Sequence, residues 1–136
     1  MRNTPNLLLQ NVRPVGGDFN GSQTVDIRIK DGTITEIRAG LNSQEDNEMT
    51  YDADGTYVSG GWMDMHVHLR EPGYEHKENI ETGCAAAAFG GFTEVACMPN
   101  TNPPIHTRDV VEFIKKKSEK LAVDVHPIGC VSKERE

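Results

Sequence analysis

Two histidines separated by one residue, His66 and His68, are the side chains of this sequence best suited to chemistry. They lie in the run 64–70, Asp-Met-His-Val-His-Leu-Arg, where polar and apolar residues alternate. Alternation predicts a strand with successive side chains on opposite faces, so both imidazoles are expected on the same face as Asp64 and Arg70. Two neutral imidazoles on one face can bind one divalent ion such as zinc. A half-exposed strand without metal is the alternative.

Three further residues extend this candidate site. Asp64 is expected to accept a hydrogen bond from an imidazole, although a strand-end hydrogen bond would also occupy it. Arg70 offers a planar guanidinium for a substrate carboxylate. Asn100 follows the next predicted strand and is expected at the same edge, where its amide could hold the same substrate. Catalytic zinc has three protein ligands, so the remaining ones must come from later in the chain or from acidic residues nearby.

The elements that position these residues alternate between strand and helix. Residues 79–89 contain four consecutive alanines and end at a glycine pair, which predicts a helix with a glycine C-cap. Strands are predicted at 93–98 and 123–128, with a helix after Thr107 between them. Strand–helix alternation requires a parallel sheet with right-handed crossovers, and the candidate site lies where its strands end.

The first part of the chain has another pattern. Three short runs rich in β-branched residues predict strands: 7–12, 25–29 and 33–37. The pair Asp31-Gly32 predicts a tight hairpin, so we expect a small antiparallel unit. The stretch 39–50 is polar and is expected to be a surface loop. We therefore divide the chain into 1–55 and 56–136.

Composition excludes several classes of function. The 14 Lys and Arg against 21 Asp and Glu give a net charge of -7, the wrong sign for nucleic acid or an anionic membrane. The first residues lack the long apolar core of a secretory signal and no apolar stretch is long enough to span a membrane, so we expect neither a leader nor a membrane span and expect the cytoplasm as the compartment. Three scattered cysteines predict reduced, buried thiols: Cys84, Cys97 and Cys130. Lys115 to Lys117 are expected to form a solvated helix end.

Two motifs together carry a family resemblance: Gly61 to Gly73, GWMDMHVHLREPG, and Met98 to Pro104, MPNTNPP. They closely resemble the dihydroorotases of the amidohydrolase superfamily. The resemblance implies an α/β fold, the start of a (β/α)8 TIM-type barrel preceded by a small antiparallel β-sandwich domain. Such a barrel needs about 250 residues, so the chain is expected to be truncated after the third barrel strand.

The resemblance also implies roles. His66 and His68 would bind one or two zinc ions, and His68, Arg70 and Asn100 would contact the substrate. The remaining ligands and the catalytic group are expected beyond Glu136, so residues 1–136 alone are expected to be inactive. The implied reaction is reversible hydrolysis of the cyclic amide of dihydroorotate to N-carbamoyl-aspartate in pyrimidine synthesis.

Other readings stay open. Allantoinases and hydantoinases share the histidine pair, but the combination of the two motifs favours dihydroorotase. A dihydroorotase-like assembly subunit without catalysis is a further alternative, and the family is compatible with a homo-oligomer or a partner from the pyrimidine pathway. Glu71 and the acidic residues after it are expected to form only a charged loop and helix start. His76, His106 and His126 match no ligand position.

Overall fold

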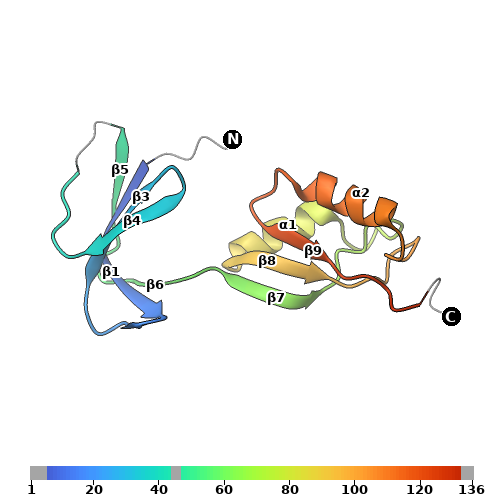
Figure 1. Ribbon diagram of the computed structural model, residues 1–136, viewed down its shortest axis with the longest axis horizontal. Helices are drawn as coiled ribbons and strands as arrows, with labels where there is room; N and C mark the ends of the chain where they lie inside the picture. Colours follow the sequence, from blue (N-terminus) through green and yellow to red (C-terminus); the bar gives the residue numbers. More distant parts are fainter. Residues whose placement is uncertain (1–5, 44–46, 133–136) are drawn as a thin grey trace. The chain divides into compact units, whose positions relative to one another are not determined.

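The computed structural model describes residues 6–43 and 47–132 and divides into two compact units, Met1–Gly60 and Gly61–Glu136 (Figure 1). The division falls after Gly60 instead of after residue 55, because β6 (Tyr57–Ser59) pairs with β1 (Asn6–Gly16) of the first unit. Within the described ranges, no helix has the length and apolar character needed to cross a membrane.

The first unit is a mixed sheet. Between β1 and β6 its strands are β2 (Phe19–Asn20), β3 (Val25–Lys30), β4 (Thr33–Arg38) and β5 (Glu48–Asp52). The predicted hairpin is confirmed, since β3 and β4 are antiparallel and Asp31 and Gly32 both have positive φ, 50° and 76°. Strands β5 and β6, however, run parallel to β1. The three predicted strands are antiparallel as expected. The unit is nevertheless mixed, because the connection after β4 carries the chain to the edge of β1 opposite β3.

Buried charges hold the connection after β4 against the sheet. Arg28 is fully buried, and its guanidinium donates to Glu48 Oε1 at 2.8 Å, to Glu36 and to the Asn42 carbonyl. Asp26, also buried, accepts from the main-chain N–H of Leu41 at 2.8 Å. The polar stretch 39–50 is thus not only a surface loop, because it supplies a buried leucine, a buried glutamate and the start of β5.

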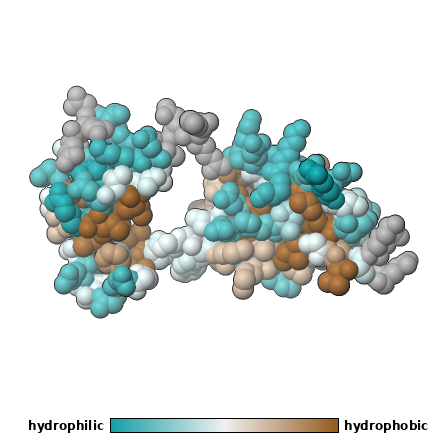
Figure 2. All heavy atoms as spheres, viewed as in Figure 1, coloured by the Kyte–Doolittle hydropathy of each residue, from teal (hydrophilic) through white to brown (hydrophobic). Residues whose placement is uncertain are grey.

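Several large apolar side chains of the first unit are exposed: Ile34, Ile37, Met49, Tyr51 and Tyr57. Figure 2 shows hydrophobic residues gathered on the visible face of this unit. A sheet with so much exposed apolar surface is typical of one that a further layer covers. The second layer of a β-sandwich stays a prediction.

The second unit is the predicted parallel sheet with its crossover helices. Strands β7 (Trp62–Val67), β8 (Phe92–Cys97) and β9 (Asp124–Pro127) lie in that order and are parallel. Helices α1 (Ile80–Phe89) and α2 (Arg108–Ser118) lie along one side of this sheet (Figure 1). The Asn79 side chain caps α1 by accepting from Thr82 N, and Gly90 ends it.

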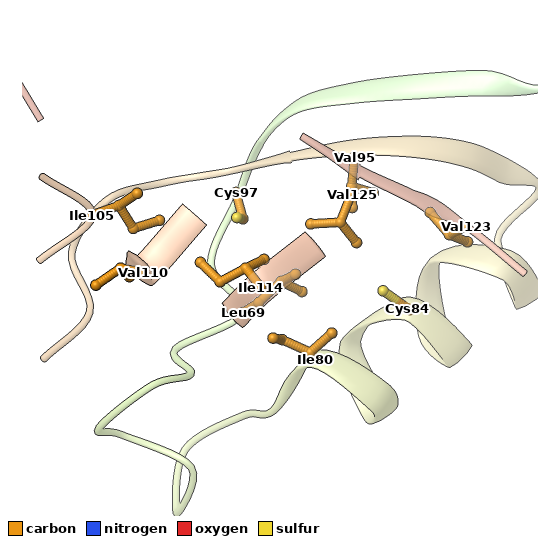
Figure 3. Close-up of a cluster of buried hydrophobic side chains, with 10 residues drawn as sticks. All are labelled: Leu69, Ile80, Cys84, Val95, Cys97, Ile105, Val110, Ile114, Val123 and Val125. Atoms are coloured by element: carbon orange, nitrogen blue, oxygen red, sulfur yellow. The ribbon is translucent and has the colours of Figure 1, made fainter. Parts of the chain in front are cut away.

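The core of this unit lies between the helices and the sheet (Figure 3). Its ten buried side chains come from α1, β8, α2 and β9 and from the segments between the elements, and Val67 of β7 packs against them. The ten are Leu69, Ile80, Cys84, Val95, Cys97, Ile105, Val110, Ile114, Val123 and Val125. Cys84, Cys97 and Cys130 are free, as predicted, although Cys130 is only half-buried. Burial raises the pKa of the Cys97 thiol to about 11.

Candidate active site

The two histidines lie close together at the end of β7. Their ring centres are 5.3 Å apart. Two imidazoles on one tetrahedral zinc, with Zn–N distances of about 2.0–2.1 Å, would have ring centres separated by roughly 5 Å. His66 is exposed and His68 is half-buried, so both imidazoles can be reached from solvent. Their spacing and their neutral nitrogen donors fit a shared divalent ion.

A hydrogen bond joins His68 to the loop after the next strand. His68 Nδ1 lies 3.0 Å from Oδ1 of Asn100. Because an amide oxygen can only accept, Nδ1 carries the proton and the lone pair of Nε2 is left free. Outer hydrogen bonds of this kind orient imidazole ligands in metal sites. The structure thus brings together His66, His68 and Asn100, from the ends of two neighbouring parallel strands.

The strand β7 is irregular after Asp64, so its side chains do not follow a simple alternation. A bulge in β7 puts Asp64 level with buried Val95 and Val67 level with buried Cys97, so β7 has one residue more than β8 over this stretch. The strict alternation predicted from Asp64 to Arg70 is therefore wrong. Asp64 Oδ1 accepts from the main-chain N–H of His66 at 2.9 Å, the strand-end alternative. Its contact with an imidazole stays a prediction.

Arg70 lies beyond the end of β7, in a γ-turn. The Glu71 N–H donates to the Leu69 carbonyl at 2.7 Å, and Arg70 between them has a φ of 62°. Positive φ at the centre of a γ-turn is uncommon and strained for a residue other than glycine. The side chain of Arg70 is half-buried, and among the described residues its guanidinium has no hydrogen-bond or ion-pair partner.

An open hollow of ≈ 430 Å³ lies beside His68 and Asn100. Most of its lining is apolar and comes from Met98, Ile128 and Val131, with the Cys130 thiol at its wall. The strands β8 and β9 end here, so the hollow lies at the carboxyl edge of the sheet. Arg70 is not part of the lining of this hollow, so a cavity shared by Arg70 and Asn100 stays a prediction.

The loops after β7 and β8 are joined directly. The Asn102 N–H donates to the Pro72 carbonyl at 2.9 Å. Gly73 has a φ of 98°, and a Cβ added there would lie 2.2 Å from the Asn102 carbonyl oxygen. Only glycine therefore allows this approach. The loop with Arg70 and the loop with Asn100 are held as one piece.

Glu71 and Lys117 contribute contacts that the sequence analysis did not predict. Glu71 is 4% exposed, accepts from the Ile80 N–H at 3.0 Å and pairs with Lys117. The three lysines at 115–117 are exposed in the last turn of α2, as expected. Two of them also make contacts, because Lys115 donates to the Val125 carbonyl at 3.0 Å in addition to the Lys117 pair. Lys117 is exposed, but it lies seven residues after Val110 and three after Ile114 and so borders the buried side of α2, which is the signal that could have revealed it.

The other histidines lie outside this cluster. His126 Nε2 contacts Glu94 Oε2 at 2.8 Å, and the His76 ring packs against Tyr74. The Nδ1 atom of His106 is buried and has no partner among the described residues. Within residues 6–43 and 47–132, no three His, Cys, Asp or Glu side chains converge as a metal site.

Residues 55–136 match the family model described as dihydro-orotase-like. The chain belongs to this dihydroorotase-like family. A dihydroorotase of Citrifermentans bemidjiense is 46% identical over 130 residues, covering 94% of this chain and 30% of that protein. A dihydroorotase of Caldanaerobacter subterraneus is 47% identical over 116 residues, covering 85% and 26%. Among solved structures, the L-hydantoinase (dihydropyrimidinase) of Arthrobacter aurescens superposes with a TM-score of 0.80 at 32% identity, over 93% of this chain and 28% of that one.

The dihydroorotase-like match contains both candidate loops. These relatives are dihydroorotases and a hydantoinase, which are cyclic amidohydrolases. The chain spans 30% of the length of the Citrifermentans bemidjiense relative. The residues of the candidate site thus lie within the segment that belongs to the family. The activity of the whole protein is proposed below.

Proposed function

We propose that this chain is the N-terminal part of a metal-dependent dihydroorotase, which hydrolyses the cyclic amide of dihydroorotate reversibly to N-carbamoyl-aspartate. One observation carries the proposal. His66 and His68 lie at ligand spacing, and Asn100 orients the second of them, within the segment that matches the dihydroorotase-like family. We further propose that the second unit begins a (β/α)8 barrel, in which these strand ends face the active-site mouth.

In this proposal each described residue has a distinct task. His66 and His68 would hold zinc, as one or two ions, through imidazole nitrogens, with Asn100 fixing the tautomer of His68. When bound, the metal would polarise the ring carbonyl and activate water. Arg70 would pair with the carboxylate of the substrate, with Asn100 as a second contact, and Asp64 would support the imidazoles. The remaining ligands and the acidic proton carrier would come from outside residues 1–136.

A hydantoinase is the second candidate, favoured by the TM-score of 0.80 to the L-hydantoinase of Arthrobacter aurescens. The two candidates differ in the ring that they bind. Dihydroorotate carries a carboxylate, for which the unpaired guanidinium of Arg70 is suited, whereas a simple hydantoin ring has none. We place dihydroorotase first because the named dihydroorotases are 46% and 47% identical to the chain.

The experiment measures metal content and turnover of dihydroorotate in the whole protein. Replacing both His66 and His68 by Ala should remove the metal and the activity together, because two ligands of the site are lost. The matched control is His76→Ala, since His76 is exposed and packs only on Tyr74. Unchanged metal and turnover in the double variant would refute the site, and a preference of the parent for hydantoin would favour the second candidate.

A further inference from the structure

The loop that presents Arg70 is anchored on both sides of that residue. Leu69 is 4% exposed and belongs to the core of the second unit. Glu71 is equally buried. Arg70, half-buried between these two residues, adopts positive φ in the γ-turn. The contacts of Leu69 and Glu71 therefore fix both ends of the turn that carries the guanidinium.

Glu71 supplies the polar half of this anchorage. One carboxylate oxygen accepts from the Ile80 N–H, at the amino end of α1, where the helix dipole favours a negative charge. The other pairs with Lys117 near the carboxyl end of α2. A buried carboxylate is stable only when it is paired in this way. The hydrogen bond that Lys117 donates to Glu71 also raises the pKa of Lys117 above its usual value.

Strained conformations persist where the surroundings hold them, and they recur at functional sites. We propose that Glu71, through Ile80 and Lys117, is a positioning residue that holds Arg70 in the γ-turn from which its guanidinium meets the carboxylate of the substrate. The inference rests on the proposed function, because it takes Arg70 as the carboxylate contact. Neither Glu71 nor Lys117 needs to touch the substrate.

The test compares two substrates in the whole protein, dihydroorotate and dihydrouracil, which has the same ring without the carboxylate. Glu71→Gln keeps an oxygen for the Ile80 N–H but removes the charge that pairs with Lys117. It should lower kcat/KM for dihydroorotate about 10- to 100-fold, the scale of a displaced binding group. Turnover of dihydrouracil and the metal content should stay close to those of the parent.

Two further variants separate positioning from a loss of folding. Lys117→Met should lower kcat/KM for dihydroorotate selectively, as Glu71→Gln does. Lys117→Arg keeps the positive charge and should retain most of the kcat/KM of the parent for dihydroorotate. Lys116→Met is the control, because Lys116 is the exposed neighbour on α2. If Lys117→Met changes neither substrate, or if both substrates lose equally, the proposal is overturned.

A double-mutant cycle decides whether Glu71 acts through Arg70. Arg70→Met alone should lower only the turnover of dihydroorotate, and adding Glu71→Gln to it should cost little more. Full additivity of the two losses would overturn the positioning role and leave the proposed function intact. Equal losses of both substrates in Arg70→Met would instead refute Arg70 as the carboxylate contact, and the positioning role would fail with it.

Discussion

At the scale of single residues, the proposed function gives the Asn100 amide two tasks, which are to orient His68 and to contact the substrate. In the structure the Asn100 oxygen accepts from Nδ1 of His68 at 3.0 Å, which leaves Nε2 for a metal. The NH2 group of the same amide remains a donor for a substrate. These tasks depend on different atoms, so different substitutions should separate them.

Asn100→Ala removes the acceptor for His68, and Asn100→Asp keeps it but replaces the NH2 donor by a negative charge. We expect the Ala variant to bind zinc about 10- to 100-fold more weakly, the usual cost of losing such an outer contact. The Asp variant should retain zinc but lose kcat/KM for dihydroorotate, because its charge repels the carboxylate. Metal titration and steady-state kinetics of the whole protein measure the two effects.

The control is Asn102→Ala, since Asn102 is an exposed residue of the same loop. It should bind zinc as the parent does. An Asn100→Ala variant with the zinc affinity of the parent would show that the hydrogen bond to His68 does not orient a ligand.

At the scale of elements, the loops after β7 and β8 form one structural piece. The contact depends on Gly73, where positive φ and the 2.2 Å approach to the Asn102 carbonyl both exclude a side chain. Gly73→Ala should therefore destabilise the whole protein by more than about 1 kcal/mol and lower its activity, because the loops separate. Urea unfolding measures the first effect. Gly129→Ala is the control, since a Cβ there would lie 3.9 Å from its nearest neighbour; equal stability of the two variants would contradict this view.

Cys97, in the central strand β8, should make the folding stability depend on pH. Its pKa of about 11 lies above the ordinary 9.0, so the unfolded chain releases this proton first as pH rises. The unfolded state then binds fewer protons than the folded state, and folding stability falls with rising pH. The contribution is fully present below pH 9 and is lost toward pH 11, with a slope approaching about 1.4 kcal/mol per pH unit.

The measurement is the free energy of unfolding between pH 8 and 11 for the parent and Cys97→Ala. The Ala variant should be less stable at pH 8 because it leaves a small cavity, but its stability should fall less steeply. The pKa of Lys117 is also raised in the folded state, so its contribution to stability falls with rising pH as well. Only the difference between the slopes of the parent and the Ala variant therefore reports on Cys97. Identical slopes would contradict the assignment.

At the scale of the whole molecule, the proposed function requires more ligands than the described part of the second unit supplies. Its described residues supply two imidazoles at ligand spacing and no convergent group of three possible ligands. Two ligands hold zinc weakly, and a catalytic zinc site ordinarily has three. The two proposed substrate contacts also come from separate surroundings, because the hollow beside Asn100 is not lined by Arg70.

Residues 1–136 alone should therefore not hydrolyse dihydroorotate and should bind zinc much more weakly than the whole protein. Turnover assays with added zinc test this expectation, and circular dichroism shows whether the sample is folded. Turnover by folded residues 1–136 at a rate comparable with a dihydroorotase would show that the catalytic groups have been misplaced.

The sequence by itself determined the elements of the second unit and the residues of its candidate site. Periodicity, caps and turn residues are local signals, and they predicted the parallel order of strands and helices as well as the β3–β4 hairpin. The pair of histidines and the two motifs also lie in short continuous segments, which is why the family could be predicted from them.

Only the tertiary structure decided how these pieces meet. The bulge in β7 depends on its pairing with β8, and the parallel pairing of β5 and β6 depends on where a long connection takes the chain. Glu71 and Lys117 are 46 residues apart, and the fold brings the buried carboxylate of Glu71 to the partly exposed ammonium of Lys117. Contacts of this range leave no periodic trace in a sequence, because the path of the chain in space, and not local spacing, brings the two groups together.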